Sequence, residues 1–213
     1  MSQPLIDLDA MMAYARDYLA RTEAAVITGR NPWRNTAAAR WEHTLRVLAL
    51  ARKIARAENA DRDLVTAATI FHDAAKLNSS PEEHAARGAL VAKEYLTRAG
   101  FPADWIARVG EIIASHTRAE GNFALEDRVL RDADILDETG ATGIVWTTMN
   151  TGIHAPSYVH ARENILTHDR HTAERAIALM LTPAGRALAE QRLAFVDQFI
   201  AQLDAELEKF LGE

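Results

Sequence analysis

The sequence predicts an all-α fold, a helical bundle with a long C-terminal helix. Three observations lead to this prediction: apolar residues recur at helical spacing, alternating β-branched runs are few, and the composition is globular, with 48% hydrophobic and 25% charged residues. A chain of 213 residues is long enough for one sizeable core. We expect a single domain over residues 1–213, with its motif-bearing core at about 40–145 and a helical extension at about 160–213.

The first part of the chain reads as three helices. Residues 5–25 have helical periodicity, and residues 31–60 hold a longer helix with His43 near the beginning of its apolar stripe. That stripe consists of Leu45, Leu48, Ala51, Ile54 and Ala55. Residues 61–77, "DRDLVTAATIFHDAAKL", are apolar almost all round, which is typical of a helix at the centre of a bundle.

The next helices have recognisable ends. Ser80 as N-cap, Pro81 after it and Glu83 three residues on form a capping box, which places His84 in a first turn, and Gly100 is a natural stop. Two further periodic segments follow: residues 102–116, which end at His116, and residues 125–140, which end at Gly140.

The last part of the chain combines a predicted loop with a long helix. Residues 150–160, "NTGIHAPSYVH", contain Asn, Gly and Pro and predict a loop, and residues 147–164 could form a lid. The four late histidines then read as solvated: His154, His160, His168 and His171. A long helix begins at Thr182-Pro183, and its apolar stripe is either core or a homodimer face.

Composition excludes several classes of protein. The formal net charge of -6 gives no basic face for long nucleic acids. No stretch is apolar enough to span a membrane, and the N-terminus has acids where a signal peptide would carry basic residues, so we expect a cytoplasmic protein without a membrane partner. Because the chain has no cysteine, any bound metal would be held by imidazole and carboxylate.

The segment "FHDAAK" carries the main chemical signal. A histidine or aspartate inside a helical core costs several kcal/mol unless it is paired or bound to a metal. His72 and Asp73 stand side by side at the end of the most apolar helix. A divalent cation meets both needs, and further ligands could come from His43, His84 or His116. Asp132 and Asp134, in "RDADILD", are candidates as well.

The order of these residues resembles the HD-domain superfamily of metal-dependent phosphohydrolases, whose pattern is H...HD...D. The resemblance covers roughly residues 40–210 and includes "EHTLRV", "FHDAAK", "HAARGA", "IIASHT" and "RDADILDETGATGI". It implies metal ligands at His43, His72, Asp73 and Asp134, the last preferred to Asp132 because of its "A-D-x-L" context. His84, with Gly88 four residues on, and His116 match the positions of second-metal or substrate ligands, so the centre holds one metal or two bridged by Asp73.

The resemblance also implies an activity. A divalent cation, whether Mn, Mg, Fe, Ni or Zn, would activate a water that attacks a nucleotide or another small phosphoester. Asp73 and Lys76 would be the catalytic residues, Asp73 orienting the water and Lys76 facing phosphate. Lys76 near a helix C-terminus could equally be a simple partner of the helix dipole. Where many members read "HDIGK", this chain has Ala75, which a helical backbone accepts.

Two other functions remain open at this stage. A di-iron oxygenase branch of the same superfamily uses the same H...HD...H...H...D set, and this chain has all six residues. A non-catalytic nucleotide-binding module is the third hypothesis, although such a module has no need of a complete buried ligand set. Metal identity and stoichiometry would separate hydrolase from oxygenase.

Overall fold

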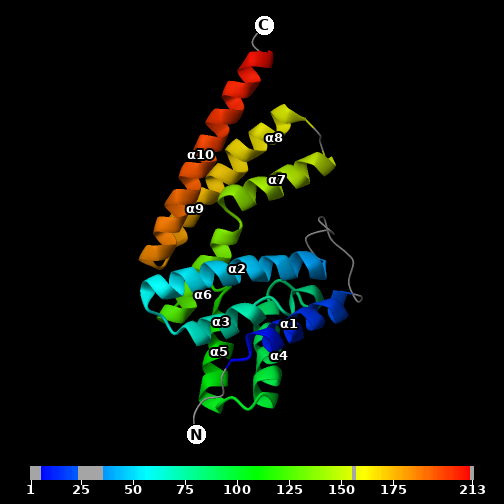
Figure 1. The fold of residues 1–213 in the computed structure, drawn as a ribbon, viewed down its shortest axis with the longest axis vertical. Helices are drawn as coiled ribbons and strands as arrows, with labels where there is room; N and C mark the ends of the chain where they lie inside the picture. The colour runs from blue at the N-terminus through cyan, green and yellow to red at the C-terminus, as the bar shows by residue number, and fades with distance from the viewer. Residues whose placement is uncertain (1–5, 24–35, 155–156, 212–213) are drawn as a thin grey trace. The chain divides into compact units, whose positions relative to one another are not determined.

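The computed structural model describes residues 6–23, 36–154 and 157–211, and the regular structure in these ranges is helical, with no β-strand (Figure 1). This confirms the all-α prediction. The chain divides into two compact units, Met1–Ala133 and Asp134–Glu213, with the boundary inside one helix. The assignment of both units to a single domain stays a prediction.

The first unit is built from the six helices that carry the sequence motifs. In chain order they are α1 (Leu8–Glu23), α2 (Ala37–Glu58), α3 (Arg62–Phe71), α4 (His84–Arg98), α5 (Ala103–Ser115) and α6 (Leu125–Asp137), with a short 3-10 turn, η2 (Lys76–Asn78), after α3. α4 and α5 lie side by side as a helical hairpin, and α2 packs on α3 (Figure 1).

α3 forms the centre of this unit, as its apolar sequence predicts. Every residue from Val65 to Phe71 is buried. The Phe71 ring lies 6.3 Å from that of Tyr14 and 5.6 Å from that of Tyr95, so aromatic contacts tie α3 to α1 and α4. Asp61 begins the helix by accepting hydrogen bonds from the N–H groups of Asp63 and Leu64. His72 and Asp73, which follow α3 directly, therefore lie next to closely packed apolar residues.

The start of α4 differs from the prediction by three residues. The Ser80 hydroxyl does accept a hydrogen bond from the N–H of Glu83 (3.3 Å), as in a capping box. However, Pro81 to Glu83 form a turn, and the helix begins at His84. The predicted first-turn position of His84 is correct, and Gly100, with a φ of +79°, ends the segment as expected.

The second unit consists of α7 (Gly140–His154), α8 (Tyr158–Asn164), a π-helical turn η3 (Ile165–Asp169), α9 (Arg170–Leu179) and α10 (Pro183–Leu211), together with the end of α6. The prediction of a loop at residues 150–160 is wrong where the structure describes them. α7 continues to His154 and α8 begins at Tyr158, because neither Gly152 inside a helix nor Ser157 as N-cap prevents helix formation. Residues 155–156 lie outside the described ranges.

α10 begins as predicted, with the Thr182 hydroxyl accepting a hydrogen bond from the N–H of Gly185 (2.9 Å). Val196 and Ile200 of its stripe are buried with Ile144 of α7 and Ile165 of η3. Phe199, which belongs to the same predicted stripe, is 36% exposed. These four buried residues form a hydrophobic cluster that joins α7, η3 and α10.

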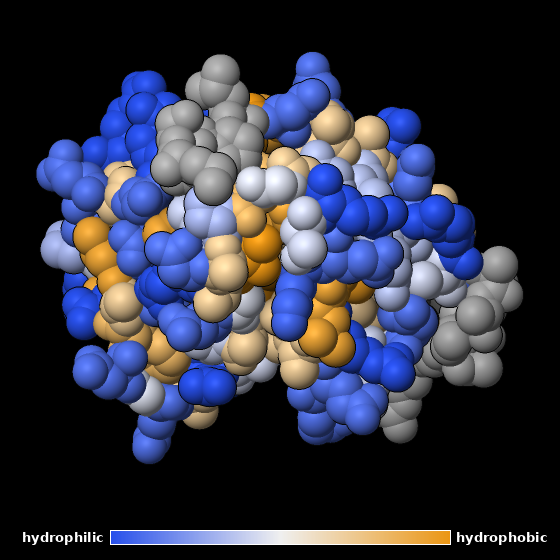
Figure 2. Space-filling view, turned by 90° about the horizontal axis from the view of Figure 1, so that it is seen from below, coloured by the Kyte–Doolittle hydropathy of each residue, from blue (hydrophilic) through white to orange (hydrophobic). Residues whose placement is uncertain are grey.

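Polar residues cover most of the face seen in Figure 2, and apolar residues form patches between them. In the described part of the chain, no helix combines the length and the apolar character needed to cross a membrane.

Candidate metal centre

The candidate site lies where α3 ends. His72 is the residue that caps α3, and Asp73 follows it in a turn. Their exposed fractions are 0% and 4%, so both polar side chains are inside the first unit, as the sequence predicts. Ala75 has a φ of −97°, a value open to any residue, so the alanine found where many superfamily members have glycine introduces no strain here.

Three buried histidines share one arrangement of the ring. Each Nδ1 lies within hydrogen-bond distance of a carbonyl oxygen three residues earlier: His72 of Thr69 (2.7 Å), His84 of Pro81 (2.6 Å) and His116 of Ile113 (2.6 Å). A carbonyl oxygen only accepts, so each Nδ1 carries the proton and donates. In a neutral ring the lone pair is then on Nε2, which is the arrangement that metal-binding histidines adopt.

The Asp73 carboxylate is shared between histidines on both of its sides. Its Oδ1 lies 3.3 Å from Nε2 of His84 and 3.8 Å from Nε2 of His116. Its Oδ2 lies 3.7 Å from Nε2 of His43 on α2. A carboxylate with ligand atoms near each of its oxygens is suited to bridge two metal ions.

The residues fit a divalent cation. One ligand atom each from Asp73, His84 and His116 lies within 4.8 Å of the others, and all three residues are buried. Imidazole nitrogen and carboxylate oxygen are ligands that Zn, Fe, Mn and similar cations accept. The structure therefore brings together the two histidines that the sequence left as second-metal or substrate contacts. Their role as ligands stays a prediction.

The other predicted ligands come from α2, α3 and α6. Nε2 of His43 lies 3.2 Å from Nε2 of His72, and His43 is only partly buried. Asp134 continues α6 directly after Ala133, as the first residue of the second unit, and is partly buried. Its neighbour Asp132 is fully buried. The choice of Asp134 over Asp132 stays a prediction that rests on the sequence motif.

Gly88 explains how α4 approaches α3 closely enough to place His84 in the site. A Cβ atom at Gly88 would lie 2.8 Å from the carbonyl oxygen of Phe71 and 2.9 Å from that of His72. Any side chain there would push the two helices apart. The glycine four residues after His84 therefore has a packing reason.

Two positively charged side chains, Lys76 and Arg40, lie beside Asp73. Lys76 Nζ lies 3.7 Å from Asp73 Oδ1 and 2.9 Å from His84 Nε2, so this lysine does face the cluster. Arg40 Nη1 lies 3.4 Å from Asp73 Oδ2. Arg40 is not among the predicted site residues, although it precedes His43 by three residues and hence shares its side of α2. Both side chains keep some exposure, 16% for Arg40 and 28% for Lys76, whereas the histidines near Asp73 Oδ1 are buried.

Burial lowers the pKa of His84, because the charged imidazolium would lose its hydration, although the Asp73 carboxylate opposes this shift. The neutral form is the one that binds metal.

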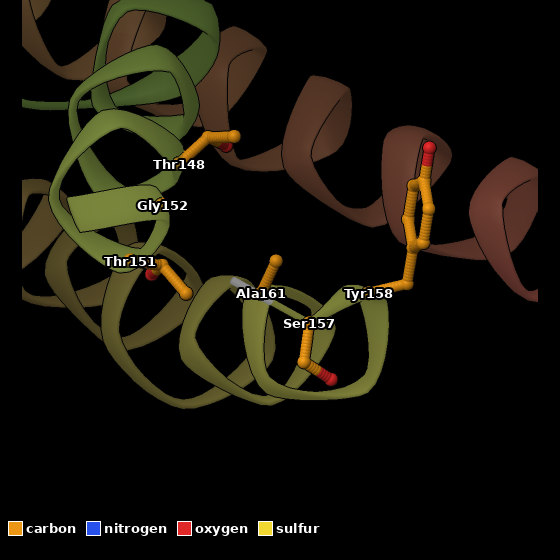
Figure 3. Close-up of a pocket in the computed structure, with 6 residues that line it drawn as sticks. All are labelled: Thr148, Thr151, Gly152, Ser157, Tyr158 and Ala161. Carbon is orange, nitrogen blue, oxygen red and sulfur yellow. The ribbon is translucent and has the colours of Figure 1, made fainter. Parts of the chain in front are cut away.

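The late histidines lie elsewhere. The side chains of His160, His168 and His171 are exposed on α8, η3 and α9, as predicted, and the side chain of His154 lies outside the described ranges. A cavity of about 340 Å³ in the second unit is bounded by the end of α7 and the start of α8 (Figure 3). Its described lining residues are uncharged: Thr148, Thr151, Gly152, Ser157, Tyr158 and Ala161. They include no metal ligand of the usual kinds.

The chain is similar over most of its length to a protein of known sequence and structure. The protein YpgQ of Bacillus subtilis is 29% identical to this chain over 173 residues, covering 78% of this chain and 83% of YpgQ. A crystal structure of YpgQ in complex with ADP has a TM-score of 0.64 at 25% identity, covering 94% of this chain and 97% of that one.

Two further structures share the fold. A predicted HD superfamily hydrolase from an uncultured Thermotogales bacterium has a TM-score of 0.64 at 24% identity, covering 94% of this chain and 92% of its own. An HD-superfamily hydrolase from Bacillus thuringiensis has a TM-score of 0.66 at 22% identity, covering 97% and 100%. Residues 40–139 match the family model described as the HD domain. This range contains every predicted ligand, and the match confirms the resemblance to the HD-domain superfamily over these residues.

Proposed function

We propose that this protein is a metal-dependent phosphohydrolase that acts on a nucleotide or another small phosphoester. The observation that carries the proposal is the position of Asp73 between histidine Nε2 atoms on both sides, with the Nδ1 of each buried histidine already bound to a backbone carbonyl. The match to the HD domain and structural neighbours described as hydrolases support the same class of reaction.

Two positively charged side chains at the site, Arg40 and Lys76, favour a phosphorylated substrate. Arg40 and Lys76 lie on either side of the Asp73 carboxylate and are less buried than the histidines near its Oδ1, so their charged ends can meet a ligand that enters from solvent. YpgQ has been crystallised with ADP, which makes nucleotides the first compounds to test. The overall charge of -6 favours a small substrate over a long polyanion.

Each residue has a defined task in the proposed reaction. His43, His72, Asp73 and Asp134 would hold one cation, and His84 and His116 would hold a second together with Asp73. A cation held there supplies Lewis acidity toward a phosphoryl oxygen and lowers the pKa of a bound water. Lys76 would bind a phosphate oxygen and neutralise charge that develops on it. The Asp73 carboxylate would accept a hydrogen bond from the attacking water and orient it.

The test is hydrolysis of a substrate panel by the full-length chain loaded with Mn²⁺ or Mg²⁺. We expect release of phosphate or pyrophosphate from at least one nucleotide or small phosphoester, and loss of this activity in His72→Ala together with its metal. A metal-loaded protein that releases neither product from the panel, while His72→Ala binds metal normally, would contradict the proposal.

The roles of Arg40 and Lys76 can be tested separately from those of the predicted metal ligands. Arg40→Met and Lys76→Met should each raise KM by about tenfold or more, the scale of one hydrogen bond to a charged group, without loss of metal. Arg52→Met is the matched control, since Arg52 is an exposed residue on the same helix, α2. If neither variant changes KM or kcat, Arg40 and Lys76 do not contact the substrate.

The six-residue set also fits the di-iron oxygenase chemistry found in the same superfamily. Elemental analysis of the purified chain discriminates between the two functions. Two irons per chain with oxygen consumption would establish the oxygenase, whereas phosphoester hydrolysis with manganese or magnesium would exclude it as the main activity.

A further inference from the structure

Arg131, on α6, holds the end of the helix that carries His116. Its side chain is almost fully buried, at 8% exposure. Nη1 of Arg131 donates hydrogen bonds to the carbonyl oxygens of Ser115 (3.3 Å), His116 (3.2 Å) and Arg118. Ser115 is the last residue of α5, His116 is its C-cap, and Arg118 lies in the turn that follows, where its N–H donates to the carbonyl oxygen of Ser115 (3.0 Å). One buried guanidinium thus binds the backbone on both sides of His116.

The guanidinium is itself held in place. It stacks over the Phe123 ring, with Cζ 4.3 Å from the ring centroid. One helical turn before Arg131, the Asp127 carboxylate accepts hydrogen bonds from the Ser115 hydroxyl (2.8 Å) and from Nη2 of Arg108 (2.8 Å). α6 therefore contacts the end of α5 through both the side chain and the main chain of Ser115.

This contact bears directly on the direction of the His116 side chain. Nδ1 of His116 donates to the carbonyl oxygen of Ile113, so the ring is oriented by the same backbone turn that Arg131 binds. With the turn fixed, Nε2 of His116 lies 3.8 Å from Asp73 Oδ1. His84 is positioned differently, through Pro81 and the close approach at Gly88. Of the two histidines near Asp73 Oδ1, only His116 has its main chain bound by Arg131 in the described structure.

We infer that Arg131 is a positioning residue for the cation that Asp73, His84 and His116 would hold. It sets the affinity of this group for metal by fixing His116, and it acts without touching metal or substrate. The inference rests on the proposed function only in that these three residues bind a metal ion. Arg131 also precedes the predicted ligand Asp134 by three residues on the same helix.

The experiment is a titration of the metal-free full-length chain with Co²⁺, followed by visible absorption and by calorimetric stoichiometry, with thermal unfolding measured in parallel. The variants are Arg131→Met and Arg131→Lys. Arg128→Met is the matched control, because Arg128 is an exposed arginine on the same helix that donates to the carbonyl oxygen of Phe123 (2.8 Å).

We expect the wild type and Arg128→Met to bind two ions with the same affinities. Arg131→Met should bind the ion of the His43, His72, Asp73 and Asp134 group normally. It should bind the second ion, which Asp73, His84 and His116 would hold, about 10- to 100-fold more weakly, the usual loss when a group that orients a metal ligand is removed. Arg131→Lys should lie between them, because an ammonium cannot reach all three carbonyls while stacking on Phe123. The Co²⁺ absorption of the second ion should change with its affinity.

Three outcomes would overturn the inference: a folded Arg131→Met with wild-type affinity for both ions, an equal weakening of both ions, or a wild type that binds a single ion. If Arg131→Met does not fold, unchanged affinity for the second ion in Arg131→Lys would overturn it as well. A wild type that binds two ions and hydrolyses no phosphoester would contradict the proposed function and leave the inference about Arg131 standing.

Discussion

Both units of the molecule contain buried aspartates, and two of these, Asp73 and Asp169, have opposite surroundings. Asp73 in the first unit is 4% exposed and lies among the Nε2 atoms of three histidines, with Arg40 and Lys76 at its sides. Asp169 in the second unit is 2% exposed and accepts one hydrogen bond, from the Thr147 hydroxyl (2.9 Å). Within the described structure its Oδ2 has no hydrogen-bond partner.

The difference shows that burial of an acid does not by itself indicate a functional site. Around Asp73, histidine Nε2 atoms and two positively charged side chains from separate segments lie near one carboxylate, an arrangement that suits a metal ion. Around Asp169, burial raises the pKa of the carboxyl above its ordinary value, and the Thr147 hydrogen bond and His168 only partly oppose this. Asp73 therefore has a chemical reason to be buried, and the burial of Asp169 costs free energy.

The strongest test of this comparison is to remove the charge from each aspartate in turn. Asp73→Asn should lower metal affinity by more than about 100-fold, beyond the effect of losing a supporting group, because the carboxylate faces histidines on both sides. Asp169→Asn should leave metal content unchanged. Elemental analysis after metal loading measures both, and equal metal content in the two variants would remove Asp73 from the site.

The packing that assembles the site should be nearly as sensitive. Gly88→Ala would place a Cβ atom within 3 Å of two backbone carbonyl oxygens of the α3 terminus, so we expect a loss of about 1–3 kcal/mol in the free energy of unfolding, with weaker metal binding.

Gly110→Ala on α5 is the matched control, since the nearest atom to its new Cβ is 3.9 Å away. This variant should gain up to about 1 kcal/mol from helix propensity. Denaturant unfolding of both variants checks the prediction, and a Gly88→Ala protein as stable as Gly110→Ala would show that α3 and α4 do not need their close contact.

The pH dependence of the free energy of unfolding should show that burial destabilises the charged form of Asp169. Since its folded-state pKa is raised, the native state binds the proton more tightly than the unfolded chain does. The stability associated with this group is therefore present at acid pH and is lost as pH rises from about 3.8 through the folded-state pKa. The free energy of unfolding of Asp169→Asn, relative to wild type, should increase over the same pH range. A difference that does not vary with pH would mean that Asp169 is not destabilised by burial.

The smallest effect is expected from the exposed ion pairs of the second unit. Arg186 and Glu190 form an i,i+4 pair on α10 at 3.4 Å, with both side chains more than half exposed. Glu190→Ala should change the free energy of unfolding by less than about 0.5 kcal/mol, because such pairs are screened by solvent and alanine is a good helix former. A loss above about 1 kcal/mol in thermal unfolding would indicate that α10 depends on its surface charges.

The helices could be predicted well because their signals are local. The apolar stretch of α3, the start of α10 at Thr182-Pro183 and the stop at Gly100 agree with the structure. The predicted stop at Gly140 is three residues late, because α6 ends at Asp137 and Gly140, with a left-handed φ of +69°, begins α7. The predicted loop at residues 150–160 was wrong because Gly, Asn and Pro mark helix ends as readily as loops. The start of α4 was misplaced because Ser80 caps a turn that precedes the helix.

The sequence by itself determined which residue types could form a site. The lack of cysteine left imidazole and carboxylate as ligands, and the motif order identified His43, His72, Asp73, His84 and His116 as candidates. Only the tertiary structure decided that Asp73 lies between histidines, that Gly88 permits the approach of α4, that Arg40 lies beside Asp73, and that Arg131 binds the backbone around His116. The physical reason is that a helical pattern reports which side of a helix is buried, whereas distances between atoms on different helices depend on how those sides pack against each other.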